Sequence, residues 1–115
     1  MSFGEIDRQL RENEDRAQAA QAAAAQALGR LLQVAERTDT GQAARIAQFI
    51  AATYNGRSYS FDLFDLRAVD VEISDDMLAC LDALRWGKSD LYKLVPDGDR
   101  RIQALCQVWG IQPRS

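Results

Sequence analysis

Apolar residues recur at helical spacing along most of the chain. They follow the i, i+3, i+4 pattern of an amphipathic helix in residues 41–54, 74–86 and 99–109. Ser74 is expected to cap the second of these helices, and Gly87 stands where that helix should end. The apolar positions of the three helices are Ala43, Ile46, Ala47, Ile50 and Tyr54, then Met77, Leu78, Leu81 and Leu84, then Ile102, Leu105, Cys106 and Trp109.

A much longer helix is predicted before them. Residues 4–37 contain no proline, and eight of the eleven residues from Ala17 to Ala27 are alanine, the strongest helix former. A helix of about 32 residues spans roughly 48 Å, whereas a compact domain of this size has a radius of gyration near 14 Å. The helix should therefore extend beyond the rest of its own domain.

A stripe of mostly small residues follows this long helix at heptad spacing. Small side chains allow a second helix to approach closely, so the stripe predicts a homodimer formed through the N-terminal helix. Two other interpretations remain open: a solvated alanine-rich extension, and an arm that binds a different partner. The candidate self-association residues are Leu10, Ala17, Ala20, Ala24, Ala27 and Leu31.

The segment 58–73 fits two patterns. Residues 61–69 form a short helix if Ser60 caps it, whereas Tyr59, Phe61 and Leu63 alternate with polar residues as a strand would. We favour the helix, because no other segment alternates convincingly and a lone strand has no partner. The predicted fold is therefore all-α, with a long N-terminal helix (residues 1–37) followed by a small helical bundle (residues 38–115).

The charge of the chain is unevenly distributed. The formal net charge is −3, but residues 62–82 hold seven carboxylates and a single arginine. Residues 83–115 carry six basic and three acidic residues. A concentrated acidic surface can steer onto a basic protein face, so the candidate partner-binding residues are Asp62, Asp65, Asp70, Glu72, Asp75 and Asp76.

Several kinds of chemistry are excluded or unsupported by the composition. The chain has no histidine, which rules out Ser-His-Asp and Cys-His catalysis and any histidine metal ligand. Cys80 and Cys106 lie within apolar helical patterns and are expected to be buried free thiols. No run of 18 apolar residues exists, and the first residues do not resemble a secretory signal. We expect a cytoplasmic protein without membrane contact, metal, cofactor or enzymatic activity.

Part of the chain resembles a known group of proteins. The resemblance covers residues 40–110 and is strongest where a Phe-Asp-Leu core is followed by Asp-Met-Leu. It implies a helical fold in a family of short uncharacterised bacterial proteins carried on plasmids, integrative elements and phages, and it implies no activity or functional residues. The matching stretches are Ala44-Arg45-Ile46-Ala47-Gln48-Phe49, Ser60-Phe61-Asp62-Leu63-Phe64-Asp65-Leu66, Val69-Asp70 and Asp75-Asp76-Met77-Leu78-Ala79.

Two functional hypotheses follow. The first is a non-enzymatic interaction protein of a mobile element, such as an inhibitor of a host defence system, which binds a basic protein partner through residues 62–82. The alternative is a nucleic-acid-associated regulator that uses the basic residues after position 83, among which Trp86, Tyr92 and Trp109 are interleaved. The acidic sequence pI of about 4.9 favours the first hypothesis.

Overall fold

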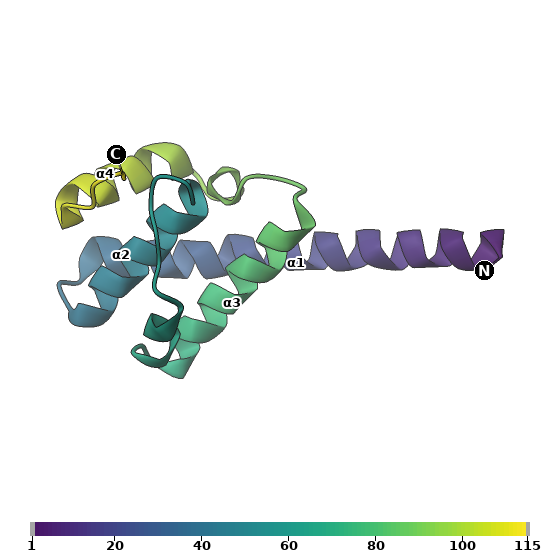
Figure 1. Cartoon of the computed structure of the whole chain (residues 1–115), viewed down its shortest axis with the longest axis horizontal. Helices are drawn as coiled ribbons and strands as arrows, with labels where there is room; N and C mark the ends of the chain where they lie inside the picture. The colour runs from purple at the N-terminus through teal and green to yellow at the C-terminus, as the bar shows by residue number, and fades with distance from the viewer. Residues whose placement is uncertain (1, 115) are drawn as a thin grey trace.

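The long first helix dominates the shape of the molecule. The computed structural model describes residues 2–114, and in it α1 runs without interruption from Phe3 to Arg37. Ser2 caps it by accepting a hydrogen bond from the backbone N–H of Glu5. The molecule measures 54 × 29 × 26 Å, and its longest dimension follows α1, whose N-terminal part projects away from the other elements (Figure 1). The predicted long helix is confirmed.

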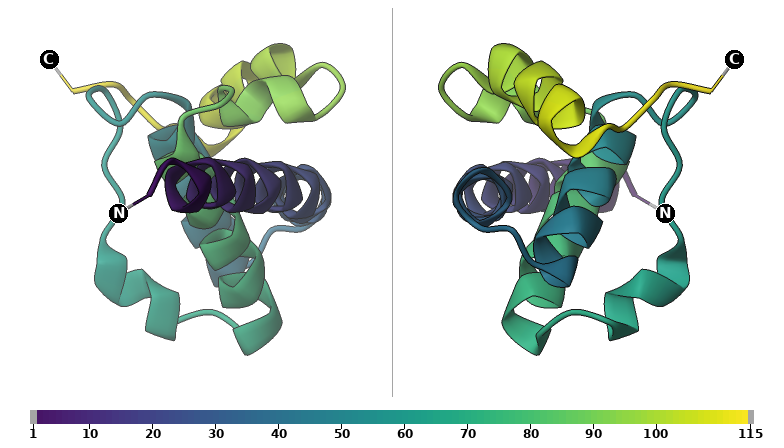
Figure 2. Two further views of the ribbon diagram at one scale, coloured as in Figure 1. Left: turned by 90° about the vertical axis from the view of Figure 1, so that its right-hand side faces the viewer. Right: turned by 90° about the vertical axis from the view of Figure 1, so that its left-hand side faces the viewer.

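The remaining elements gather around the second half of α1. They are the α-helices α2 (Gly41–Tyr54), α3 (Val71–Trp86) and α4 (Gly98–Trp109) and the short 3₁₀ helices η1 (Leu63–Arg67) and η2 (Leu91–Leu94). Residues 2–114 contain no strand, so the all-α prediction is confirmed. In the views along α1, α4 and the η1 segment lie on opposite sides of the α2 and α3 pair (Figure 2).

The most extensive contact between helices joins α1 and α3, which run in opposite directions (Figure 1). At one end the Arg16 guanidinium lies 5.3 Å from the Trp86 ring centroid. At the other, Arg30 donates two hydrogen bonds of 2.8 and 3.0 Å to the carboxylate of Asp76. Between these two contacts most of the buried residues are small, and the larger ones are Leu28 and Met77. The small buried residues are Ala17, Ala20, Ala24 and Ala27 on α1, and Cys80 and Ala83 on α3. Small side chains on both helices permit the close packing.

Two predicted helix starts between α2 and α3, at Ser60 and at Ser74, are wrong. The helical turn in this segment is a five-residue 3₁₀ helix, and the cap is Asp62, which accepts from the backbone N–H of Phe64, in place of Ser60. The α3 helix begins at Val71, so Ser74 lies inside it and bonds back to the Val71 carbonyl. The start is set from outside the segment, because the side chain of Gln42 accepts a 2.7 Å hydrogen bond from the backbone N–H of Asp70.

The C-terminal helix is preceded by a constrained turn. Asp97 adopts a left-handed conformation with φ of 56°, and Gly98 then opens α4 in a buried position. A side chain at Gly98 would overlap the carbonyl oxygen of Tyr92. Only glycine therefore allows α4 to pack closely against η2. None of the helices within residues 2–114 is both long and apolar enough to cross a membrane.

Candidate functional site

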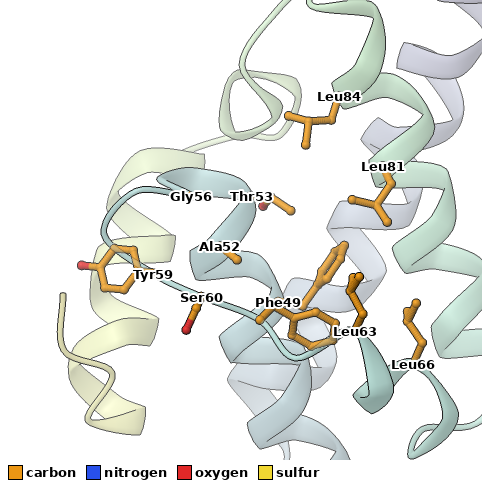
Figure 3. Close-up of a pocket in the computed structure, with 11 residues that line it drawn as sticks. Phe49, Ala52, Thr53, Gly56, Tyr59, Ser60, Leu63, Leu66, Leu81 and Leu84 are labelled. Atoms are coloured by element: carbon orange, nitrogen blue, oxygen red, sulfur yellow. The ribbon is translucent and has the colours of Figure 1, made fainter. Parts of the chain in front are cut away.

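An apolar groove of about 330 Å³ lies between α2, α3 and the chain that leads into η1. Helix α2 forms one wall, α3 forms the other, and the segment from Gly56 to Leu66 closes the side (Figure 3). The groove is lined by Phe49, Ala52, Thr53, Gly56, Tyr59, Ser60, Phe61, Leu63, Leu66, Leu81 and Leu84. Most of these side chains are apolar. Leu63 and Leu66 of η1 lie at one end of the groove, and Leu81 and Leu84 extend from α3 along its side (Figure 3).

Large apolar side chains at the rim of the groove are exposed to solvent. The relative exposure of Leu63 is 70% and that of Leu84 is 43%. Phe64, next to Leu63, is 69% exposed, with the Arg67 guanidinium over its ring. Scattered exposed leucines are ordinary, but a contiguous apolar patch beside a groove is typical of a binding surface.

The orientation of α3 explains this exposure. Sequence periodicity placed Met77, Leu78, Leu81 and Leu84 on one buried face. The structure instead buries Met77 together with Cys80 and Ala83, and it leaves Leu78 and Leu84 exposed at 52% and 43%. The small residues are inward because α1 presents alanines there. The large residues consequently face away from α1, and Leu81 and Leu84 line the groove.

Four of the six predicted partner-binding acids already make contacts within the chain. Asp62 caps η1, and Asp65 lies 3.5 Å from the guanidinium of Arg45. The carboxylate of Asp70 accepts a 3.3 Å hydrogen bond from Gln42, while Asp76 forms the bidentate pair with Arg30. The hydrogen bond that Arg30 donates to Asp76 raises the pKa of Arg30 above its ordinary value. These carboxylates stabilise the fold in addition to any role in binding.

Glu72 and Asp75 differ from the other four. Both are exposed on the first turns of α3, and their side chains make no hydrogen bond or ion pair within residues 2–114. Three arginines from elsewhere in the sequence, Arg30, Arg45 and Arg85, pair with acids of the segment 62–82. With Arg67 this gives seven carboxylates against four arginines. The net charge of this surface is therefore −3. The segment 62–82 taken alone has a net charge of −6, so the paired arginines halve the excess.

The predicted self-association stripe is largely used within the chain. Ala17, Ala20, Ala24, Ala27 and Leu31 are at most 6% exposed and belong to the core packed against the other helices. They form no free surface for a second copy. The exception is Leu10, which is 62% exposed on the projecting part of α1. The alanine-rich part is therefore the packed half of the helix, and the charged first half is the extension.

The basic residues after position 83 are also engaged within the chain. Arg101 forms a bidentate pair with Glu36, and the hydrogen bond lowers the pKa of Glu36. Lys88 lies 2.7 Å from Glu14, and Arg114 donates to the carbonyl of Gly56. The other three basic residues, Arg85, Lys93 and Arg100, pair with Asp82, Asp90 and Asp97.

The interleaved aromatic residues pack against the core as well. Trp86 is flanked by two arginine guanidiniums, and the Trp109 indole donates to the carbonyl of Ala35. Tyr92 makes an edge contact with Tyr54. Such rings do not form an open platform on which nucleic-acid bases can stack.

Both cysteines are buried free thiols, as the sequence predicted. Burial raises the pKa of the Cys80 thiol to about 12, and the negative charge of Asp76 adds to the effect. Burial also raises the pKa of Cys106. A thiol with a raised pKa is protonated at neutral pH and is a poor nucleophile. Residues 2–114 contain no group of three or more carboxylates and thiols arranged to hold a metal ion.

Comparison with known proteins places this architecture in a family. A model for a family of unknown function, DUF7673, matches residues 25–110. The chain belongs to DUF7673. The matched region of DUF7673 starts inside α1 and ends after α4, so it contains the last part of α1, from residue 25 onward, and every residue that lines the groove. It begins earlier than the resemblance at residues 40–110 and leaves the projecting part of α1 outside. No curated protein and no solved structure matches the chain.

The groove was missed at the sequence level for an identifiable reason. Helix α3 has apolar residues on two sides, so either side could be the buried one, and the larger side chains of the leucines favoured their side. The sequence feature that indicates the correct side is the alanine run in α1, because an alanine-rich helix face packs closely with small residues on its neighbour. Cys80 and Ala83 satisfy that requirement, while Leu81 and Leu84 do not.

Proposed function

We propose that the chain is a non-enzymatic protein-interaction module that binds an amphipathic helix of a partner protein. The observation that carries the proposal is the apolar groove with its exposed leucine rim. Grooves of this kind take helices whose apolar side chains recur at i, i+3, i+4 and i+7. The negative excess of the segment 62–82 favours a partner helix with basic residues beside its apolar stripe.

The proposal includes a biological setting. The resemblance to small proteins of plasmids, integrative elements and phages supports a role as an accessory protein or as an inhibitor of a host defence protein. Nucleic-acid binding is less well supported, because the six basic side chains of its candidate surface make contacts within the chain.

The test compares the proteins captured from cells of the source bacterium by matched variants of the tagged full chain. The groove variant carries Leu63→Asp and Leu84→Asp, and the control carries Val108→Asp. All three side chains are exposed, Val108 at 79% on α4, so the variants should fold. Thermal unfolding by circular dichroism checks this. We expect a protein that is enriched on the wild type and the control and lost on the groove variant. An identical set on all three would refute the proposal.

The acidic contribution needs a separate variant. Asp75→Lys reverses an exposed charge without breaking an internal pair, and Asp15→Lys reverses an exposed charge on the projecting part of α1, outside the acidic segment, as a control. Charge reversal within the acidic segment should slow association with the captured partner about tenfold at low salt by weakening electrostatic steering, and the difference should shrink at high salt. Equal association rates for the two variants would remove the acidic surface from the proposal.

A further inference from the structure

The projecting part of α1 carries an apolar stripe that nothing in the chain covers. We call the segment Phe3–Arg16 the arm; all of its residues are exposed. Phe3, Ile6 and Leu10 are 89%, 39% and 62% exposed and stand at i, i+3 and i+7. At 100° per residue they lie within about 50° of the line through Ala17 and Ala24. The arm therefore continues the same face of α1 that the core covers farther along.

The arm has the features of a ligand for the groove. Three large apolar side chains on one face of a helix, spaced at i, i+3 and i+7, are the anchors that an apolar groove recognises. Residues 3–11, which hold all three anchors, contain two acids and two arginines, so this part of the arm is neutral. The arm's net charge of −2 comes from residues 12–16, which lie beyond the anchors. The arm lies outside the matched family region, whereas the groove lies inside it.

The arm cannot reach the groove of its own chain. It is the first 14 residues of an uninterrupted helix whose second half is fixed in the core. The helix holds the arm straight and pointing away from α2 and α3, over a length of about 21 Å (Figure 1). Any groove that it occupies therefore belongs to another molecule.

We propose that two copies of the chain exchange arms, so that the arm of each copy lies in the groove of the other. This inference rests on the proposed function, because it uses the same groove. Stable interfaces bury roughly 1,200–2,000 Å². Pairing of the arms alone would join only three large apolar side chains from each copy, whereas reciprocal exchange buries two arms and two grooves. The exchange is self-complementary and closes at two copies.

The exchange is tested by the mass of the full chain in solution, measured by light scattering after size-exclusion chromatography at up to about 100 μM. The arm variant carries Phe3→Ser and Leu10→Ser, and the groove variant carries Leu63→Asp and Leu84→Asp. We expect the wild type to be a dimer, and we expect the dissociation constant of the dimer to rise at least about tenfold in each variant. Arg8→Ser, on the opposite face of the arm, serves as the control and should remain dimeric.

Mixing the two variants gives the decisive result. One copy then supplies an intact arm and the other an intact groove, so a heterodimer with one complete contact should form although neither variant dimerises alone. A monomeric wild type, a groove variant that still dimerises, or a mixture that stays monomeric would each overturn the exchange. An open polymer that grows with concentration would overturn the reciprocal closure. A monomeric wild type that still captures a partner through the groove would leave the proposed function intact.

Discussion

Replacement of Ala24 by leucine tests whether the alanine stripe is an internal packing surface. Ala24 is fully buried in the core cluster at the contact between α1 and α3. Leucine adds three carbon atoms where the two helices leave no space, so the neighbouring side chains and backbone must shift. Overpacking of this kind costs about 1–3 kcal/mol. In a chain of this size it lowers the melting temperature by roughly 4–15 °C.

The adjacent residue supplies a matched control. Ala23 is exposed on the same helix, and Ala23→Leu makes the same chemical change with almost the same helix propensity. Its effect on the free energy of unfolding should stay within about 0.5 kcal/mol. The two variants thus differ only in whether the added atoms meet a packed interior.

Thermal and urea unfolding followed by circular dichroism measure the difference, with light scattering at each condition. An internal stripe predicts loss of stability in Ala24→Leu without change of mass. If the stripe instead joined two copies through α1, Ala24→Leu would change the mass measured by light scattering. Equal unfolding free energies for the two variants would refute the packing argument.

Three further outcomes follow from the same structure. Gly98→Ala should destabilise the chain by at least about 2 kcal/mol in urea unfolding because its Cβ would overlap the Tyr92 carbonyl, whereas Gly29→Ala, in open space within α1, should stabilise it by about 0.5–1 kcal/mol. The pKa of Glu36 is held below its ordinary value of 4.5 by Arg101, so the pair contributes stability above that pH and loses it as the pH falls through the lowered value. Unfolding measured from pH 6 down to about 3 should show an acid-dependent loss of at most about 1 kcal/mol that Glu36→Gln lacks. The thiols should be unreactive toward a disulfide reagent at pH 8 in the native protein and should react in urea at the unfolding midpoint, since burial raises the pKa of Cys80 to about 12; rapid reaction of the native protein would contradict this.

The helices were predictable where a local signal was sufficient. The alanine run determines α1, and α2 begins at Gly41 and ends at Tyr54, as the apolar spacing and Asn55-Gly56 indicated. Gly87 ends α3 in the left-handed conformation expected of a residue after a helix. Each of these features depends on residues within one turn of the helix end, so the sequence pattern was enough.

The features that were predicted wrongly depend on contacts between distant parts of the chain. The start of α3 is set by Gln42, 28 residues away, and no local pattern reveals that hydrogen bond. The pairing of Asp76 with Arg30 likewise joins positions 46 residues apart, so the acidic surface looked stronger in the sequence than it is. The buried face of α3 depends on what α1 offers to it, which is a property of the pair of helices.

The distribution of apolar side chains in α3 bears directly on function. Burial of a leucine side chain contributes about 1.5–3 kcal/mol, so a helix selected only for monomer stability would turn its leucines inward. Here Cys80 and Ala83 are buried, while Leu78 and Leu84 remain about half exposed. The arm repeats the arrangement, with its largest apolar residue, Phe3, almost fully exposed. Two uncovered apolar surfaces, one concave and one a helical stripe, are accounted for together if each is completed by another protein chain.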